Sequence, residues 1–121
     1  MNAAGKIVTT SDQTHASKAI RALNDKFRTS FVGGRVVLAA GVAALAEHDL
    51  LVLLQLVRSF DAFSADNDPH EEHDFGAIDF GDHRYFWKID CYDRSMEAGS
   101  DDPTDPAATT RVLTVMRADE Y

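Results

Sequence analysis

Residues 71–93, EEHDFGAIDFGDHRYFWKIDCYD, decide the fold because they predict a β-hairpin rich in aromatic and β-branched residues. The turn between the arms is Gly81-Asp82, and a glycine at the first central position suits a two-residue type II′ turn. This turn places Phe80 opposite His83 and thereby sets the register of all the other pairs. The expected arms are Phe75–Phe80 and Arg84–Asp93.

Alternation of side chains assigns one face of the hairpin to the core. Gly76 lies opposite Trp87 on this face, which leaves room for the indole ring over the neighbouring strand. Cys91 lies on the same face with no basic residue beside it, so we expect a buried, inert thiol. The core face comprises Gly76, Ile78, Phe80, Tyr85, Trp87, Ile89 and Cys91.

The opposite face carries two expected cross-strand pairs, Asp79 with Arg84 and His73 with Asp90. The second pair is open to three interpretations: a structural contact, general acid–base chemistry, or mixed nitrogen and oxygen ligands for a divalent metal. The structural contact is favoured, because the spacing matches no established metal or hydrolase motif. The catalytic alternative would use His73, Asp74, Lys88, Asp90 and Asp93, and the metal alternative His73 and Asp90.

Upstream of the hairpin, residues 1–9 are expected to be a flexible lead-in to a single domain over residues 10–121. A capping-box pattern begins at Thr10 and predicts a first helix of about 16 residues. Its apolar stripe is Ala16, Ala19, Ile20, Leu23 and Phe27, and its expected solvated side is Lys18, Arg21, Lys26 and Arg28.

The remaining elements are a strand over Arg35–Ala40, a Leu-rich helix over Ala46–Phe63 and a strand over Arg111–Arg117. The helix is apolar on two sides, which predicts that it is largely buried, Leu51 and Leu56 included. The order α-β-α-β-β-β predicts a small α+β domain, an antiparallel four-stranded sheet with two helices packed on one face.

Charge is unevenly distributed in this chain, whose net charge is −8. Residues 59–106 contain fourteen acidic and three basic residues, whereas residues 1–58 are net basic. Such a field repels a phosphate backbone and attracts a basic protein surface, although it also simply promotes solubility. We therefore expect a protein or protein complex, not nucleic acid, as the partner. The candidate partner-binding residues are Asp66, Asp68, Glu71, Glu72, Asp101, Asp102 and Asp105.

Two features bear on the compartment. The longest apolar run, Val36–Leu45, is shorter than a membrane span, so no membrane association is expected. The single Cys excludes an intramolecular disulfide framework and suits a reducing compartment, which favours the cytoplasm. The connection 94–110 is long for a compact domain, and such loops are usually functional or mobile.

The sequence resembles the small bacterial family catalogued as domain of unknown function 3768, found mainly in alphaproteobacteria and on their plasmids. The resemblance covers roughly residues 19–121 and implies no established activity, cofactor or catalytic residue. It implies a mobile-element setting, in which small acidic proteins often counter host defence systems. The motifs that carry it are Phe31–Leu38 (FVGGRVVL), Asp66–Pro69, Glu72–Gly76, Phe86–Asp90, Tyr92-Asp93, Gly99-Ser100, Asp102-Pro103, Asp105-Pro106 and Arg111–Thr114.

Three hypotheses follow. The first is a non-catalytic acidic protein-binding module without a cofactor, acting as an inhibitor of a host defence or DNA-processing complex. The alternative is a small metal-assisted hydrolase or nuclease that uses His73, Asp74, Asp90 and Asp93. The third is a structural homodimer formed through sheet edges or through Phe86 and Tyr92.

Overall fold

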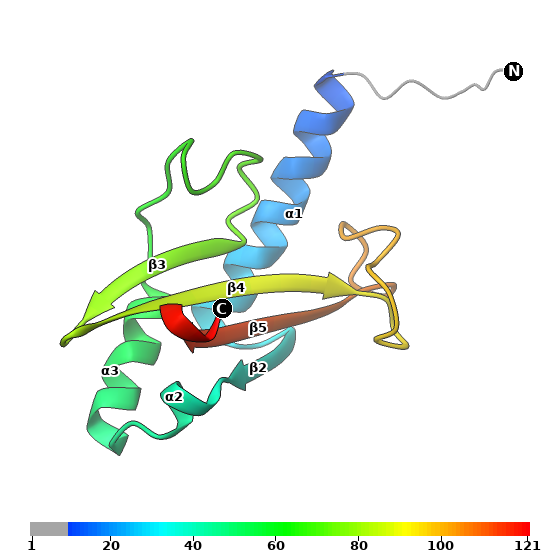
Figure 1. Cartoon of the computed structure of the whole chain (residues 1–121). Coiled ribbons are helices and arrows are strands. Elements are labelled where there is room, and N and C mark those ends of the chain that lie inside the picture. Colours follow the sequence, from blue (N-terminus) through cyan, green and yellow to red (C-terminus); the bar gives the residue numbers. More distant parts are fainter. Residues whose placement is uncertain (1–9) are drawn as a thin grey trace, which may run out of the picture.

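A computed structural model describes residues 10–121, with side chains from residue 15 onward (Figure 1). The lead-in expected for residues 1–9 lies outside the described residues. The α+β class is confirmed. The elements are α1 (Thr10–Ser30), β2 (Gly34–Leu38), α2 (Ala40–Ala43), α3 (Glu47–Arg58), β3 (Phe75–Phe80), β4 (His83–Tyr92), β5 (Thr110–Arg117) and the 3-10 helix η1 (Ala118–Glu120).

The four strands form one sheet in the order β2-β5-β4-β3. β4 is antiparallel to both of its neighbours, but β2 and β5 are parallel, so the prediction of a wholly antiparallel sheet was wrong for one pair. The cause is the helical crossover through α3, which returns the chain to the end of the sheet where β2 began. β3 therefore runs in the direction of β2, and after two reversals β5 does so too.

The predicted hairpin register is confirmed along β3 and β4. Phe80 lies opposite His83, Asp79 opposite Arg84, and Gly76 opposite Trp87. The Gly76 backbone approaches the indole so closely that a Cβ atom there would clash with the Trp87 ring and with Phe60. Gly76 is thus the residue that lets the indole lie flat beneath β3.

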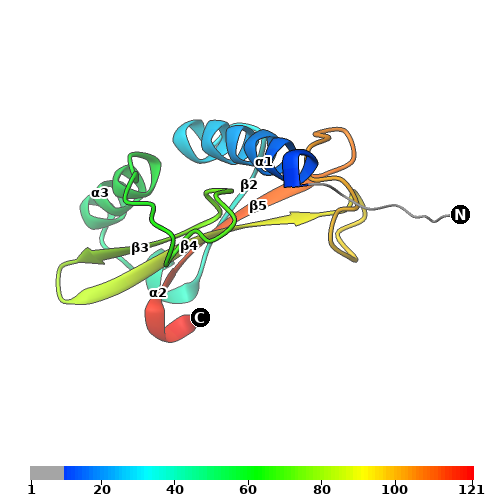
Figure 2. The ribbon, with the colours of Figure 1, turned by 90° about the horizontal axis from the view of Figure 1, so that it is seen from above.

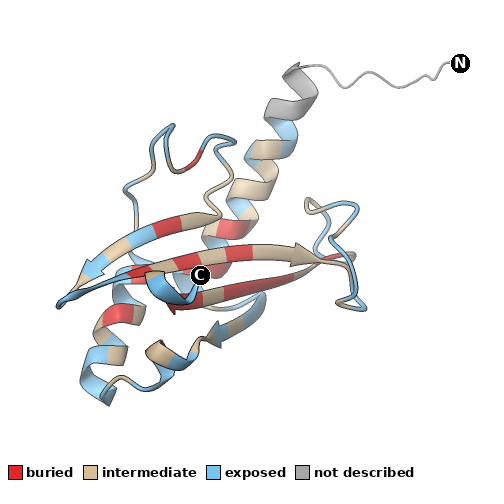
Figure 3. Ribbon diagram, viewed as in Figure 1, coloured by how far each residue is buried: buried red, intermediate tan, exposed pale blue. Residues whose placement is uncertain are grey.

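The core lies between the sheet and helices α1 and α3, which cover the same face (Figure 2). Buried residues follow the central strands and the inward sides of these helices (Figure 3). The predicted core face of the hairpin is confirmed: Tyr85, Trp87 and Ile89 are buried. The buried core cluster is Phe27, Val42, Leu53, Val57, Tyr85, Trp87, Ile89, Leu113 and Val115.

The second helix differs from its prediction. Instead of one helix over residues 46–63, the chain forms the short α2 and then α3, which ends at Arg58. Leu51 is 59% and Leu56 37% exposed, so the expectation that this helix is buried on two sides was wrong. α3 packs through one stripe only, because it lies over the sheet as an outer layer.

Arg28 contacts the C-terminal end of α3. Its Nη1 atom donates hydrogen bonds to the backbone carbonyls of Val57 and Arg58 in the last turn and of Phe60 just beyond the helix. The Val57 carbonyl also accepts from the Phe60 amide, at 3.3 Å. The side chain is 3% exposed, so the prediction that Arg28 belongs to a solvated face was wrong. Helical spacing alone does not reveal that a neighbouring helix ends against this position.

No helix within the described part of the chain has the length and apolar character needed to cross a membrane.

Candidate functional site

The acidic segments form two loops at separate places along the sheet. Loop 59–74 leads into the start of β3, whereas loop 93–109 connects the end of β4 to the start of β5 (Figure 1). β3 begins at Phe75 opposite Lys88, partway along β4, whereas β4 continues to Tyr92 opposite Thr110. The predicted partner-binding residues are therefore divided between two loops, and we call the acidic segments of these loops together the acidic end (residues 61–74 and 93–105).

Loop 93–109 is held by its own hydrogen bonds. Asp102 Oδ1 accepts from the Thr104 amide at 3.1 Å, and Asp105 Oδ1 from the Ala107 amide at 2.9 Å. The Ser100 and Thr109 hydroxyl groups lie 2.7 Å apart across the loop. Asp101, Asp102 and Asp105 are exposed, so two of the three also act as turn acceptors while facing solvent.

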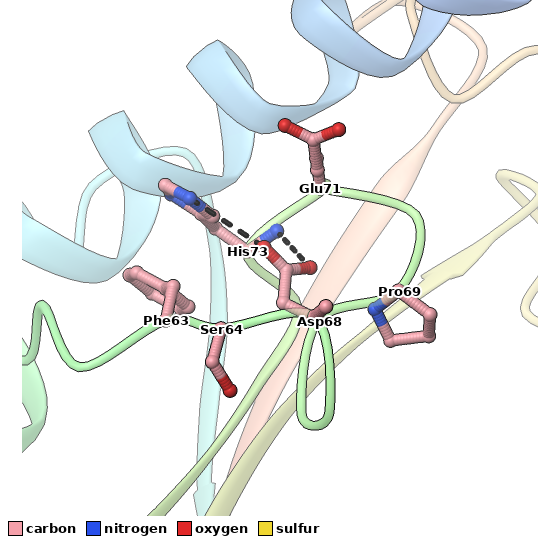
Figure 4. A pocket seen from close by; sticks show the side chains of 7 residues that line it. Phe63, Ser64, Asp68, Pro69, Glu71 and His73 are labelled. Atoms are coloured by element: carbon pink, nitrogen blue, oxygen red, sulfur yellow. Dashed lines mark hydrogen bonds and ion pairs between the residues drawn. The ribbon is translucent and has the colours of Figure 1, made fainter.

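A pocket of about 400 Å³ opens beside the other loop (Figure 4). Loop residues supply its whole lining, and the backbone amide of Asp68 donates to the Ser64 carbonyl at 2.8 Å, which closes the loop on itself. The polar groups at this pocket are mainly carboxylates and an imidazole. Its walls include Phe63, Ser64, Asp68, Pro69, Glu71 and His73.

His73 lies between two carboxylates and on an aromatic ring. Its Nδ1 atom is 2.9 Å from Asp25 Oδ1 on α1, and its Nε2 atom is 3.5 Å from Asp68 Oδ2. The imidazole stacks on Phe63 with ring centroids 3.7 Å apart and planes only 2° from parallel. The arrangement fastens loop 59–74 to α1.

The predicted cross-strand pair of His73 and Asp90 was wrong. The β3–β4 ladder begins with Phe75 opposite Lys88, and His73 has a positive φ of 54° that turns it out of the strand. Asp90 instead pairs with Lys88, whose Nζ atom is 2.9 Å from Asp90 Oδ2. His73 therefore contacts Asp25 of α1 and not Asp90.

Asp68, one of the predicted partner-binding residues, is 4% exposed. Its Oδ1 atom accepts hydrogen bonds from the backbone amides of Glu72 and His73, at 3.0 and 3.1 Å. Both amides belong to a stretch in which Glu71 and His73 have positive φ. The Asp68 carboxylate is therefore committed to holding the loop and is not free for a partner.

Asp66 and Glu71 are exposed, whereas Glu72 is half-buried. The Glu71 side chain is 80% exposed, and its Oε1 atom lies 3.9 Å from the Arg21 guanidinium. Its backbone carbonyl also accepts a hydrogen bond from Arg21 at 3.2 Å. Asp66 and Glu71 thus offer carboxylates to solvent on a loop whose backbone is fixed.

Glu72 and Asp74 hold carboxyl groups that resist ionisation. Burial raises the pKa of Glu72, and the nearby Asp74 carboxylate raises it further. Burial likewise raises the pKa of Asp74, to which the charges of Asp68 and Asp90 add. His70 opposes the shift at both groups. Ionisation of Glu72 and Asp74 is therefore disfavoured first by burial and second by the neighbouring carboxylates.

Of the residues of the catalytic alternative, Asp74 and Lys88 lie near Asp90, whereas His73 pairs with Asp25 and Asp68. Asp93 Oδ1 accepts from the Ser95 hydroxyl and the Glu97 amide, at 2.8 and 3.1 Å, which makes it a turn acceptor. The Ser64 side chain points away from His73 (Figure 4), and Asp68 faces the remaining imidazole nitrogen. Over residues 10–121, no three His, Cys, Asp or Glu side chains form a group able to hold a metal ion.

Cys91 and Phe86 lie on opposite faces of β4. Cys91 is half-buried and Arg111 lies opposite it in the sheet, so the expectation of a buried thiol with no basic neighbour was wrong. Burial raises the pKa of the thiol, and the charge of Arg111 opposes this shift. On the other face, Phe86 packs against Phe75 and Tyr121, with ring centroids 5.1 and 5.7 Å apart. The aromatic surface considered for a homodimer is thus partly covered by the C-terminal residue.

Helix α1 contributes residues to the site that sequence reasoning missed. Asn24 donates to the Glu72 carbonyl at 3.0 Å, and Asp25 holds both His73 and the Arg28 guanidinium, the latter at 3.1 Å. A signal for Asn24 was present: it occupies the apolar stripe four residues after Ile20, where a polar side chain needs a buried partner. No comparable signal marks Asp25.

Comparison with known proteins gave one match. The model of a family described as "Protein of unknown function (DUF3768)" matches residues 38–120. No curated protein and no solved structure matches the chain.

Proposed function

The chain belongs to the family of proteins of unknown function DUF3768, and on this premise we propose that it is a non-catalytic acidic module that binds a basic surface of a protein or protein complex. The supporting observation is the raised pKa of Glu72 and Asp74 at the acidic end of the sheet. Carboxylates that are half-buried beside one another destabilise the free protein, and arrangements of this kind concentrate at functional sites.

A cationic partner would relieve this repulsion. Residues 59–83 contain eight acidic residues and no Lys or Arg, so the loop supplies no basic residue of its own. Among the described residues, the basic side chain paired with Glu71 is Arg21, at 3.9 Å, and 80% of the Glu71 side chain is still exposed. Lysine or arginine side chains of a partner would meet Asp66 and Glu71 first, then the pocket beside Phe63.

The backbone of the acidic end favours binding over chemistry. Asp68, Asp102 and Asp105 each accept backbone amides within their loops, so the exposed carboxylates are carried on loops of defined shape. A preformed surface loses less conformational entropy on binding than a mobile one. The long connection 94–110 thus serves, in this proposal, as a positioned part of the interface.

The more specific form of the proposal is an inhibitor of a DNA-processing or host-defence complex in the cytoplasm. A nucleic-acid channel is a basic surface of this kind, because the exposed carboxylates of the chain are anionic like the phosphates of the nucleic acid that the channel binds. The chain would then compete with DNA for that channel instead of binding DNA itself.

The test compares two double variants with the same change in net charge. Asp66→Asn/Glu71→Gln alters the acidic end, while Asp79→Asn/Asp82→Asn alters the β3–β4 turn at the opposite end of the sheet. A fluorescent peptide of ten arginines serves as the probe, and its affinity is measured by anisotropy at low and moderate salt. We expect the first variant to bind more weakly and the second to bind like the wild type.

Equal weakening in both variants would mean that net charge alone attracts the peptide and would contradict a defined surface. The specific form is tested by affinity capture from a nuclease-treated host lysate, with the same two variants as controls. A captured DNA-binding complex should release bound DNA when the chain is added. Simultaneous binding of DNA and the chain would contradict the inhibitor proposal.

A further inference from the structure

A second pocket, of about 200 Å³, lies where α1 approaches the turn at 31–33 and loop 103–109. Its lining is mostly apolar, with Leu23 and Phe27 from the helix, Val32 from the turn and Pro106 from the loop. Two basic residues, Lys26 and Arg111, join these walls. The pocket therefore has mainly apolar walls and two positively charged side chains.

Arg111 is the unusual member of this lining because it is 3% exposed. Its Nε atom donates to Asn24 Oδ1 at 2.8 Å, and its Nη2 atom donates to the Pro103 carbonyl. Both acceptors are uncharged. Among the described residues, no carboxylate forms an ion pair with Arg111.

A buried guanidinium without a counter-ion is costly, since burial removes water that would otherwise solvate the charge. The Nη1 atom of Arg111 has no hydrogen-bond partner within the described residues, and it is not among the fully enclosed unpartnered atoms. Arg111 is thus not completely enclosed, although it is 3% exposed overall, and it is one of the residues that line this pocket. Lys26, which is exposed and has no ion pair in the described part of the chain, adds a second positive charge.

We propose that this pocket binds a small organic carboxylate, whose carboxylate pairs with Arg111 and Lys26 while its apolar end contacts Leu23, Phe27 and Val32. The unpartnered Nη1 atom of Arg111 can donate a charge-assisted hydrogen bond to a carboxylate, and the apolar walls favour an organic anion over an inorganic one. The pocket volume of about 200 Å³ corresponds to roughly six or seven water-sized groups of about 30 Å³ each. A branched five-carbon acid is of this size.

The inference is independent of the proposed function. The acidic end would recognise cations through Asp66 and Glu71, whereas this pocket would recognise an anion between α1 and loop 103–109. Residues 1–58, which supply most of the lining, carry seven basic and four acidic residues. The pocket lining itself contains two basic residues and no carboxylate, although Asp105 of the acidic end directly precedes Pro106 in the lining.

Binding is tested by titrating the full chain with isovalerate and, in parallel, with isovaleramide, its neutral isostere. Backbone amide chemical shifts of Val32, Gly33 and Thr109 provide the readout. We expect saturable shifts with isovalerate only. Lys26→Gln should weaken the affinity by about tenfold, as expected for one charge-assisted contact, while Lys18→Gln on the same helix should not change it.

Arg111→Lys should abolish saturation. Because this change touches a buried side chain, Val32→Asp provides a second variant: Val32 is 70% exposed, and a carboxylate there should repel the ligand without unfolding the chain. Equal shifts with the amide, or unchanged affinity in both Lys26→Gln and Val32→Asp, would overturn the proposal. Arg111 would then be a structural residue that joins α1 to loop 103–109 and binds nothing.

Discussion

The Nδ1 atom of His73 lies 2.9 Å from Oδ1 of Asp25, joining a loop residue to a helix residue 48 positions earlier in the chain. Asp25 also accepts a hydrogen bond from Arg28, which in turn contacts the carbonyls at the end of α3. The guanidinium carbon of Arg28 is 5.0 Å from the centroid of the Trp87 ring. One carboxylate thus couples the loop of the candidate site to the core of the fold.

A double-mutant cycle with Asp25→Asn and His73→Gln should reveal this coupling. We expect an interaction energy of about 1–2 kcal/mol from urea denaturation, because hydrogen bonds to charged groups exceed those between neutral groups. The control cycle uses Asp79→Asn and Arg84→Gln, a fully exposed ion pair at the hairpin turn with side chains 71% and 58% exposed. A coupling at Asp25–His73 no larger than in this control would contradict the structural role.

Asp68 and Asp66 should respond differently to the same substitution. Asp68→Ala removes the acceptor of two backbone amides, so we expect the free energy of unfolding to fall by about 2–4 kcal/mol. Asp66→Ala changes an exposed carboxylate and should alter stability by less than about 0.5 kcal/mol. Chemical denaturation of the two variants checks the contrast, and equal effects would show that the loop does not depend on Asp68.

Gly76→Ala should be strongly destabilising. A Cβ atom there would clash with Trp87 Nε1 and lie 2.8 Å from Phe60 Cζ, both in the core. Overpacking of this kind costs about 1–3 kcal/mol, occasionally more. Thermal melting of Gly76→Ala should show a lower midpoint and altered Trp fluorescence, whereas Ala77→Ser on the exposed face should behave like the wild type. An unchanged midpoint would mean that the indole can move aside.

The raised pKa values of Glu72 and Asp74 predict how stability varies with pH. Their stabilising contribution is complete below their unfolded pKa values of about 4 and is lost as pH rises through the folded values. Glu72→Gln/Asp74→Asn should therefore be more stable than the wild type at pH 7, with a difference that shrinks towards pH 4. Unfolding free energies across this range provide the measurement.

Asp93 serves as a control because its pKa is shifted in the opposite direction, downwards. Its hydrogen bond from the Ser95 hydroxyl lowers the pKa of Asp93, so its contribution is present above the unfolded pKa and lost as pH falls. Asp93→Asn should therefore be less stable than the wild type at pH 7. If the Glu72/Asp74 variant also lost stability at pH 7, the like-charge repulsion inferred at the acidic end would be wrong.

Local chemistry made much of the fold predictable. The Gly81-Asp82 turn specified the hairpin register, and alternation then identified Tyr85, Trp87 and Ile89 as core residues. The parallel pairing of β2 with β5 was not predictable in this way, because it depends on the direction in which the α3 crossover returns the chain. The exposure of Leu51 likewise depends on what lies beside α3.

The candidate site was predictable only in outline. Charge counting identified the acidic segments, which the structure shows as two separate loops. Charge counting could not separate the exposed Asp66 from the buried Asp68, since both are aspartates two positions apart in one loop. The distinction arises from which backbone amides each carboxylate faces after the loop has folded.

The sequence by itself determined the class of the fold, the hairpin register and the sign of the charge at each part of the chain, because turn chemistry, side-chain alternation and ionisation are properties of short segments. Only the tertiary structure decided that His73 meets Asp25 instead of Asp90, that Arg28 is buried at the end of α3 and that Arg111 has neutral partners. Each of these contacts joins residues distant in sequence. Their partners are chosen by how helices and loops pack, which no local pattern encodes.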